Sequence, residues 1–132
     1  DNAFIVPINK EQPKQSKEEV KNVFVFGNPR IKVTLPKGYE KNIVALLVDD
    51  RLEMYDKLNR DADKDGYLFS VTQYETGSDM EGIVKIYDDR NNTTTALISA
   101  TDVRFDIDRE AYMNSWNKNY DFYSKNIIVE FQ

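Results

Sequence analysis

The sequence predicts an α+β domain: a mostly antiparallel β-sheet followed by one C-terminal helix that packs on one face of the sheet. The first observation is a series of short apolar or alternating runs between residues 23 and 107, separated by turns rich in Gly, Pro, Asn and Asp. The second is an aromatic residue at every third or fourth position after residue 108, the period of a helix that buries one face. Strands joined by short turns pair antiparallel, and a single helix can then cover one face of their sheet.

Each strand is predicted from its own pattern. A run of four apolar residues over 23–26 ends at Gly27-Asn28-Pro29, and over 31–35 Ile, Val and Leu alternate with Lys and Thr. The segment over 67–74 is rich in β-branched and aromatic residues, which is typical of a strand. The other strands are expected over 43–48, 51–55, 83–87, 94–100, 103–107 and 127–131, with a polar loop over 59–66 and a turn over 88–92.

The C-terminal helix is expected to begin after Asp108, whose side chain suits an N-cap. Its aromatic stripe has the spacing of residues that pack on a sheet, so we expect the stripe in the core rather than on a ligand-binding surface. The stripe consists of Tyr112, Trp116, Tyr120, Tyr123 and Ile127. Tyr55, Tyr67 and Tyr74 are the stronger candidates for an exposed platform, since flat rings stack on carbohydrate or peptide groups.

The chain divides into an N-terminal tether, residues 1–22, and a single α+β domain, residues 23–132. Residues 9–21 are rich in Lys, Gln, Glu and Pro and have almost nothing to bury. Within the tether, Ser16 and Glu19 have the spacing of a capping box, which predicts a short helix. Residues 4–6 are apolar, and pairing as an edge strand is the alternative for that part of the tether.

Composition excludes several classes of function. The chain of 132 residues contains no Cys and no His, so it has no disulfide, no cysteine or histidine catalytic centre and no ordinary transition-metal site. The formal net charge is -5 and the basic residues form no stripe, which argues against nucleic acid as a partner. No apolar run is long enough for a transmembrane segment.

Three segments carry a resemblance to a known family. They are 33–39, an L-P-x-G-aromatic turn; 52–57, followed after a polar loop by 66–71; and 101–105, which leads into a helix. In this order they resemble a group of uncharacterised secreted proteins and lipoproteins of Gram-positive Firmicutes, related to the Mog/PsbP-like α/β/α sandwich. The resemblance covers about residues 30 to 131.

The resemblance implies fold and location more than chemistry, because it brings no catalytic residue. It implies that Tyr39 packs behind its turn, and that Leu68 and Phe69 fill the two faces of a central strand. It also implies that Asp102 fixes the strand-to-helix corner by bonding backbone amides. The location that it implies is outside the cytoplasm of a Gram-positive bacterium, extracellular or anchored at the cell surface.

The D-x-D-x-D-G spacing of residues 61–66 matches the first half of a calcium loop. Asp61, Asp63 and Asp65 would supply carboxylates and Tyr67 its backbone carbonyl. Thr72 stands where such a loop has a bidentate Glu, so calcium would bind only weakly, with a dissociation constant on the order of 0.1–1 mM. The alternative is a solvated hairpin loop made of turn-forming residues.

Paired carboxylates are a second candidate for chemistry, because two such groups can hydrolyse a glycosidic bond when a cleft raises the pKa of one. In strands and turns, however, neighbouring side chains point in different directions. The close pairs are Asp49 with Asp50, Asp88 with Asp89, and Asp106 with Asp108.

The function that follows is a non-enzymatic, extracytoplasmic ligand- or protein-binding domain of a secreted or lipid-anchored protein. Its partner would be a protein or small ligand at the cell surface, and no cofactor is expected apart from weakly bound calcium. One alternative is a calcium-stabilised surface module that uses the loop over 61–66. The other is a carboxylate-based hydrolase.

Overall fold

The computed structural model describes residues 21–132, so the expected tether lies almost wholly outside the described residues. A 3₁₀ helix, η2, follows the second strand, and the other elements are strands and α-helices. In chain order they are β1 (Val23–Phe26), β2 (Ile31–Thr34), η2 (Tyr39–Lys41), β3 (Ile43–Val48), β4 (Arg51–Asp56), α1 (Lys57–Asp61), β5 (Tyr67–Glu75), β6 (Ile83–Arg90), β7 (Thr93–Ile98), α2 (Glu110–Ser124) and β8 (Ile128–Phe131).

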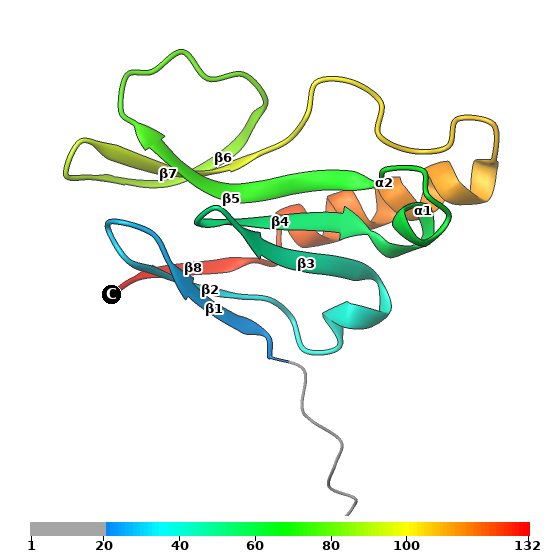
Figure 1. The fold of residues 1–132 in the computed structure, drawn as a ribbon, viewed down its shortest axis with the longest axis horizontal. Helices are drawn as coiled ribbons and strands as arrows, with labels where there is room; N and C mark the ends of the chain where they lie inside the picture. Colours follow the sequence, from blue (N-terminus) through cyan, green and yellow to red (C-terminus); the bar gives the residue numbers. More distant parts are fainter. Residues whose placement is uncertain (1–20) are drawn as a thin grey trace, which may run out of the picture.

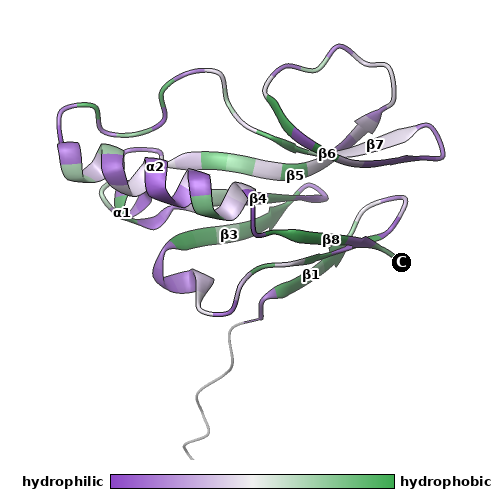
Figure 2. Ribbon diagram, turned by 180° about the vertical axis from the view of Figure 1, so that it is seen from behind, coloured by the Kyte–Doolittle hydropathy of each residue, from purple (hydrophilic) through white to green (hydrophobic). Residues whose placement is uncertain are grey.

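The α+β class is confirmed, but the strands of the described residues form two antiparallel sheets rather than one (Figure 1). The larger sheet has the order β3-β4-β5-β7-β6, and the smaller has the order β1-β2-β8. The smaller sheet consists of the β1–β2 hairpin and of β8, which follows the helix and returns to pair with β2. Helix α2 packs against β4 and β5, and the view from behind shows it in front of the end of these strands that lies near α1 (Figure 2).

Two tight turns explain the hairpins of the larger sheet. Asp49 and Asp50 join β3 to β4 with φ angles of 48° and 61°. Asn91 and Asn92 join β6 to β7 with φ angles of 53° and 62°. Two successive left-handed residues match the twist of the flanking strands, and Asp and Asn tolerate this conformation better than other side chains.

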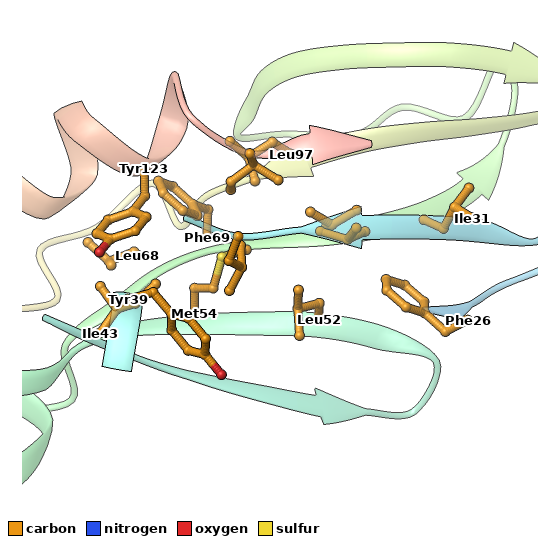
Figure 3. Packing of buried hydrophobic residues seen from close by; sticks show 14 residues of the cluster. Phe26, Ile31, Tyr39, Ile43, Leu52, Met54, Leu68, Phe69, Leu97 and Tyr123 are labelled. Carbon is orange, nitrogen blue, oxygen red and sulfur yellow. The ribbon is translucent and has the colours of Figure 1, made fainter. Parts of the chain in front are cut away.

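The core lies between the two sheets and the C-terminal half of α2 (Figure 3). Phe26 and Ile31 from the smaller sheet meet Leu52 and Met54 from β4, and all four are at most 2% exposed. The aromatic stripe of the helix packs here from Trp116 onward as predicted, with Tyr123 buried and Trp116 and Tyr120 half-buried against the same cluster, whereas Tyr112 lies outside it. Tyr39 is also buried in this cluster, as the family resemblance implies.

Leu68 and Phe69 are both fully buried, but they belong to one core cluster instead of filling two faces of β5. The register between β4 and β5 shifts between Met54 and Tyr55, which leaves Leu68 as an extra residue on β5. Such a bulge breaks the alternation of side chains, so two neighbours can point to the same side.

Three segments differ from the sequence prediction. Residues 57–61 form α1, which includes the start of the polar loop expected over 59–66, because Asp56 caps a helical turn. Strand β6 runs on to Arg90, so the turn is shorter than expected. Residues 99–109 form no strand, and Val103 and Ile107 are 61% and 70% exposed.

The N-cap of α2 also differs, because Arg109 occupies that position and makes no side-chain capping bond. The backbone N–H of Asp108 instead donates to Asp106 Oδ1 at 2.9 Å. This bond makes Asp106, rather than Asp102, the residue that fixes the corner before the helix. Asp102 is exposed, and its carboxylate accepts from Arg104 Nε at 2.8 Å.

A buried polar network joins β4, α1 and α2. The carboxylate of Asp56 is fully buried, and its Oδ2 accepts from the backbone N–H of Asn59 at 2.9 Å and from Asn59 Nδ2 at 2.6 Å. Its Oδ1 accepts from Ser115 Oγ and from Asn119 Nδ2, both at 2.6 Å. Asn59 also donates to the carbonyl of Tyr112 and accepts from the N–H of Asp106. Four donors therefore surround one carboxylate that no cation neutralises among the described residues.

Tyr87 on β6 gives a prediction for alkaline pH. Its hydroxyl is buried with no hydrogen-bond partner among the described residues, and burial raises its pKa to about 12. Between about pH 10 and 12 an unfolded chain loses this proton while the folded chain keeps it, so stability falls as pH rises through this range. Tyr87→Phe should weaken that fall and, by removing an unsatisfied group, raise the free energy of unfolding by about 1 kcal/mol at neutral pH.

Urea unfolding of the two proteins from pH 7 to 11.5 measures both effects. The control is Tyr112→Phe, whose hydroxyl accepts from Arg109 Nη1 at 3.0 Å at the surface. Equal or lower stability of Tyr87→Phe at neutral pH would mean that the buried hydroxyl has a partner in solution.

Candidate functional site

A shallow cleft lies on the face of the larger sheet that points away from the core. Side chains alternate along β4, so Leu52 and Met54 enter the core while Arg51, Glu53 and Tyr55 point outward. We call this hollow the outer cleft, and its volume is about 260 Å³. It is lined by Arg51, Glu53, Tyr55, Asp65, Tyr67 and Arg104.

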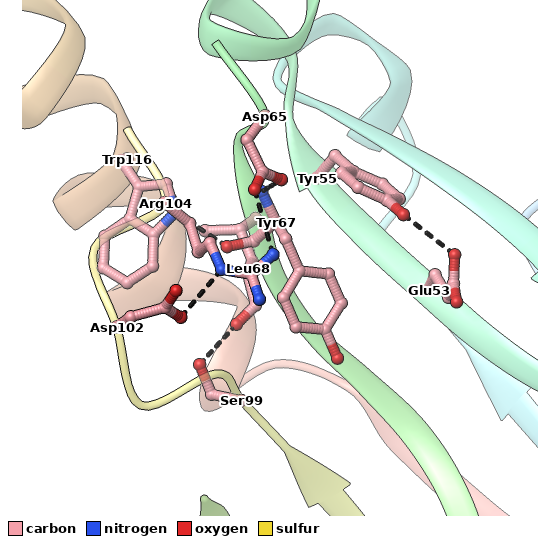
Figure 4. A network of polar contacts seen from close by, with 9 residues as sticks. All are labelled: Glu53, Tyr55, Asp65, Tyr67, Leu68, Ser99, Asp102, Arg104 and Trp116. Atoms are coloured by element: carbon pink, nitrogen blue, oxygen red, sulfur yellow. Dashed lines mark hydrogen bonds and ion pairs between the residues drawn. The ribbon is translucent and has the colours of Figure 1, made fainter. Parts of the chain in front are cut away.

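Two tyrosines from neighbouring strands form the floor of the outer cleft (Figure 4). The rings of Tyr55 and Tyr67 meet edge to face, with centroids 5.6 Å apart and planes at 66°. The hydroxyl of Tyr55 donates to Glu53 Oε1 at 2.8 Å, and that of Tyr67 bonds Ser70 Oγ at 2.6 Å. Burial raises the pKa of both phenols, so each remains a neutral hydrogen-bonding group at physiological pH.

The charges of the outer cleft balance one another. Arg51 contacts Glu53 Oε2 at 2.7 Å through Nη2. Arg104 reaches Asp65 at 2.9 Å and Asp102 at 2.8 Å (Figure 4). The hydrogen bond from Arg104 lowers the pKa of the Asp102 carboxyl, and its hydrogen bonds with Asp102 and Asp65 raise the pKa of Arg104. Two guanidinium groups and two carboxylates line the cleft, so the charges of its lining side chains sum to zero.

The backbone under the cleft is held in place from behind. Trp116 Nε1 donates to the carbonyl of Tyr67 at 2.9 Å, and Ser99 Oγ donates to the carbonyl of Leu68 at 2.6 Å (Figure 4). The indole also stacks on Tyr120, with centroids 5.0 Å apart. The floor of the cleft is thus attached directly to α2, and the single tryptophan lies one hydrogen bond from it.

The predicted calcium loop is placed differently from a loop that curls around a cation. Asp61 ends α1 and pairs with Lys57 at 2.9 Å, while Asp65 accepts from the N–H of Tyr67 and from Arg104. The carbonyl of Tyr67, the fourth expected ligand, accepts from Trp116. Over residues 21–132 no group of three or more acidic side chains is arranged to hold a metal ion. Calcium binding through Asp61, Asp63 and Asp65 therefore stays a prediction without geometric support.

The three carboxylate pairs occupy separate structural positions. Asp49 and Asp50 form the β3–β4 turn. Asp88 bonds Arg90, and Asp89 accepts from Thr94 Oγ1 at 2.7 Å. Asp106 is buried at the corner before α2. Asp49 thus belongs to a turn, Asp88 makes a strand contact, and Asp106 fixes a corner. The hydrolase remains a prediction.

A larger hollow of about 710 Å³ runs along α2, but three of its polar side chains, Asn42, Ser115 and Asn119, serve the fold. Asn119 donates to Asp56 and to the carbonyl of Asn42, and Ser115 donates to Asp56. Asn42 donates to the hydroxyl of Tyr123 at 3.3 Å. A ligand here would compete with bonds that hold the helix on the sheet, so we favour the smaller outer cleft.

The strand pattern indicated some residues of the outer cleft and missed others. Tyr55 and Tyr67 were expected on an exposed strand face, and they lie there together, whereas Tyr74 lines a different hollow. Arg51 and Glu53 alternate with core residues, which is the signal that identifies their face. Arg104 had no such signal, because it comes from an irregular segment 39 residues away from its partner Asp65.

Comparison with models of known protein families gave no match, and neither the curated proteins nor the solved structures provide a significant match. Among residues 21–132 no helix has the length and apolar character needed to cross a membrane.

Proposed function

We propose that this chain is a non-enzymatic ligand-binding domain that acts outside the cytoplasm, as part of a secreted or lipid-anchored protein. Its resemblance to secreted Gram-positive proteins supports the location, which is extracellular or at the cell surface. The observation that carries the binding function is the outer cleft, where two tyrosines and four charged side chains converge on an open sheet face. Concave sites that combine aromatic rings with a few fixed polar groups are typical of ligand binding.

The charge balance of the outer cleft favours a neutral ligand. A strongly charged ligand would have to break the Arg51–Glu53 or Arg104–Asp65 pair. A saccharide could instead bridge these groups through its hydroxyls, because guanidinium and carboxylate groups present two parallel hydrogen-bonding positions. The aromatic rings would contact the apolar face of a sugar ring. We therefore propose a neutral, polyhydroxylated ligand of the saccharide class.

The test is a titration with neutral oligosaccharides built from glucose and from N-acetylglucosamine, followed by the fluorescence of Trp116. We expect saturable binding that Tyr55→Ala weakens by roughly 5–30-fold, equivalent to about 1–2 kcal/mol of lost contact. Phe122→Ala is the matched control, because Phe122 is 47% exposed and lines the hollow along α2 instead. Weaker binding in Phe122→Ala but not in Tyr55→Ala would move the site to the helix, and no binding by either sugar class would reject the saccharide proposal.

A further inference from the structure

Strand β5 has one edge that is only partly covered. Its first part pairs with β4, and the last Cα partners on that side are Leu52 and Val71. On the other side, residues 70–75 pair with β7 through to Glu75. The described chain therefore leaves the β4 side of residues 72–75 without a strand partner. The open edge begins beside the β3–β4 turn, because β4 starts there and does not extend alongside the rest of β5.

The direction of the free backbone groups follows from the pairing. In an antiparallel strand the N–H and C=O groups of one residue point to the same edge, and those of the next residue point to the opposite edge. Thr76 donates its N–H to the carbonyl of Asn92 on the β7 side, so the groups of Gln73 and Glu75 point to the open edge. The carbonyl of Glu75 accepts from the N–H of Ser78. Both groups of Gln73 and the N–H of Glu75 are then available to an added strand.

A hollow of about 600 Å³, here called the edge hollow, lies along this open edge. Its walls come from the three hairpin connections at the left end of the molecule in Figure 1. The side chain of Gln73 holds the β1–β2 connection, accepting from the N–H of Asn28 at 2.9 Å and donating to the carbonyl of Pro29 at 2.8 Å. These bonds fix one wall relative to the strand edge, so the hollow is preformed.

The charges around the edge hollow are mainly acidic. Asp49, Asp50 and Glu75 line it. Among the described residues, Arg51 is the cationic side chain of the lining, and it pairs with Glu53. An added strand would bring its own side chains beside these carboxylates. Electrostatic complementarity therefore favours a segment with Lys or Arg side chains over an acidic one.

We propose that the edge hollow binds a short extended segment of a partner protein that carries basic side chains and adds as a strand to residues 72–75 of β5. Main-chain hydrogen bonds to Gln73 and Glu75 supply affinity, as in other cases of strand addition, and the acidic turn selects the basic sequence. The site is separate from the saccharide function proposed for the outer cleft, although Arg51 borders both hollows.

The test uses the full chain and a synthetic peptide, acetyl-Thr-Lys-Val-Lys-Val-Thr-amide, with binding followed by the NMR shifts of backbone amides. Two further peptides carry N-methyl groups on both Lys residues or on both Val residues, so that each blocks one edge of the peptide. We expect shifts at Gln73 and Glu75, and loss of binding for only one of the methylated peptides. Equal binding of both methylated peptides would overturn strand addition.

Charge is tested by Asp49→Asn combined with Asp50→Asn, because Asn retains the left-handed turn. This variant should bind the peptide about three- to tenfold more weakly, since two exposed attractions are removed. The control is Asp61→Asn combined with Asp121→Asn, which changes the net charge equally but lies on the two helices. An equal loss of peptide affinity in both variants would show that only the net charge of the protein matters, and would reject the site.

Two other measurements separate this site from its alternatives. Tyr55→Ala should leave peptide binding unchanged, so failure of the saccharide proposal does not remove this one. Concentration-dependent dimerisation that protects the Gln73 amide without peptide would place a second copy of the chain on the edge and overturn the proposed partner.

Discussion

Replacing Asp56 with Ala is expected to lower the free energy of unfolding by about 3–5 kcal/mol, because the change leaves buried donors without their acceptor. The carboxylate accepts four hydrogen bonds, from Asn59 twice and from Ser115 and Asn119 once each. Domains of this size have only about 5–15 kcal/mol of total stability. Much of the Ala variant is therefore expected to be unfolded at 37 °C.

Asp56→Asn keeps the protein measurable if the Ala variant does not fold. It retains the volume but replaces one acceptor oxygen with a donor, so we expect a loss of at least about 2 kcal/mol. Urea unfolding gives both values. The matched control is Asp61→Asn at the end of the short helix that Asp56 caps, where the exposed pair with Lys57 contributes no more than about 0.5 kcal/mol. Similar losses at the two positions would show that the buried network does not carry the stability assigned to it.

The second large effect is expected for Gly82→Ala, which should lose at least about 3 kcal/mol, the sum of an unfavourable backbone conformation and a steric overlap. Gly82 has a φ of 78°, and a Cβ there would lie 2.0 Å from the carbonyl oxygen of Ser99. That separation is far inside van der Waals contact, and Ser99 donates its own N–H to the carbonyl of Gly82 at 2.8 Å. The substitution would therefore push the start of β6 away from the end of β7.

Gly77→Ala separates the two contributions. Gly77 has a φ of 94°, and no neighbouring atom of the described residues lies within 4 Å of the position that a methyl group would take there. Only the backbone cost of about 1–2 kcal/mol therefore applies. Thermal and urea unfolding of the two Ala variants measure the difference. Equal losses would mean that the loop before β6 moves freely enough to relieve the overlap.

The class of the fold was predictable because its signals are local. The alternation of Ile31 and Val33 with polar residues and the helical spacing from Trp116 to Tyr123 each depend on a few neighbouring residues. The second sheet was not predictable, because its pairing of β2 with β8 joins distant parts of the chain. The apolar residues Val103 and Ile107 alternate as a strand would, yet only Phe105 between them packs, against Trp116 at 5.3 Å.

The residues of the candidate site also fall into those that local sequence patterns predict and those that they do not. Alternation along β4 indicated that Glu53 and Tyr55 share a face, but the bulge at Leu68 made the face of each β5 residue impossible to assign from sequence. The acidic spacing of residues 61–66 suggested a cation, whereas the structure supplies Lys57 and Arg104 as partners for two of its carboxylates. Buried Asp56 resembles any surface Asp in sequence, because only tertiary contacts distinguish it.

The pairing of β2 with β8 also determines when the domain can finish folding. Synthesis proceeds along the chain, so β1 and β2 emerge early, with Ile31 and Val33 ready to be buried and one edge of β2 unpaired. Their sheet is completed only when the strand after α2 arrives. Long-range pairing of this kind delays folding, and exposed strand edges invite association in the meantime. A chain whose smaller sheet is completed last, at β8, would leave an edge of β2 unpaired until both α2 and β8 have been made.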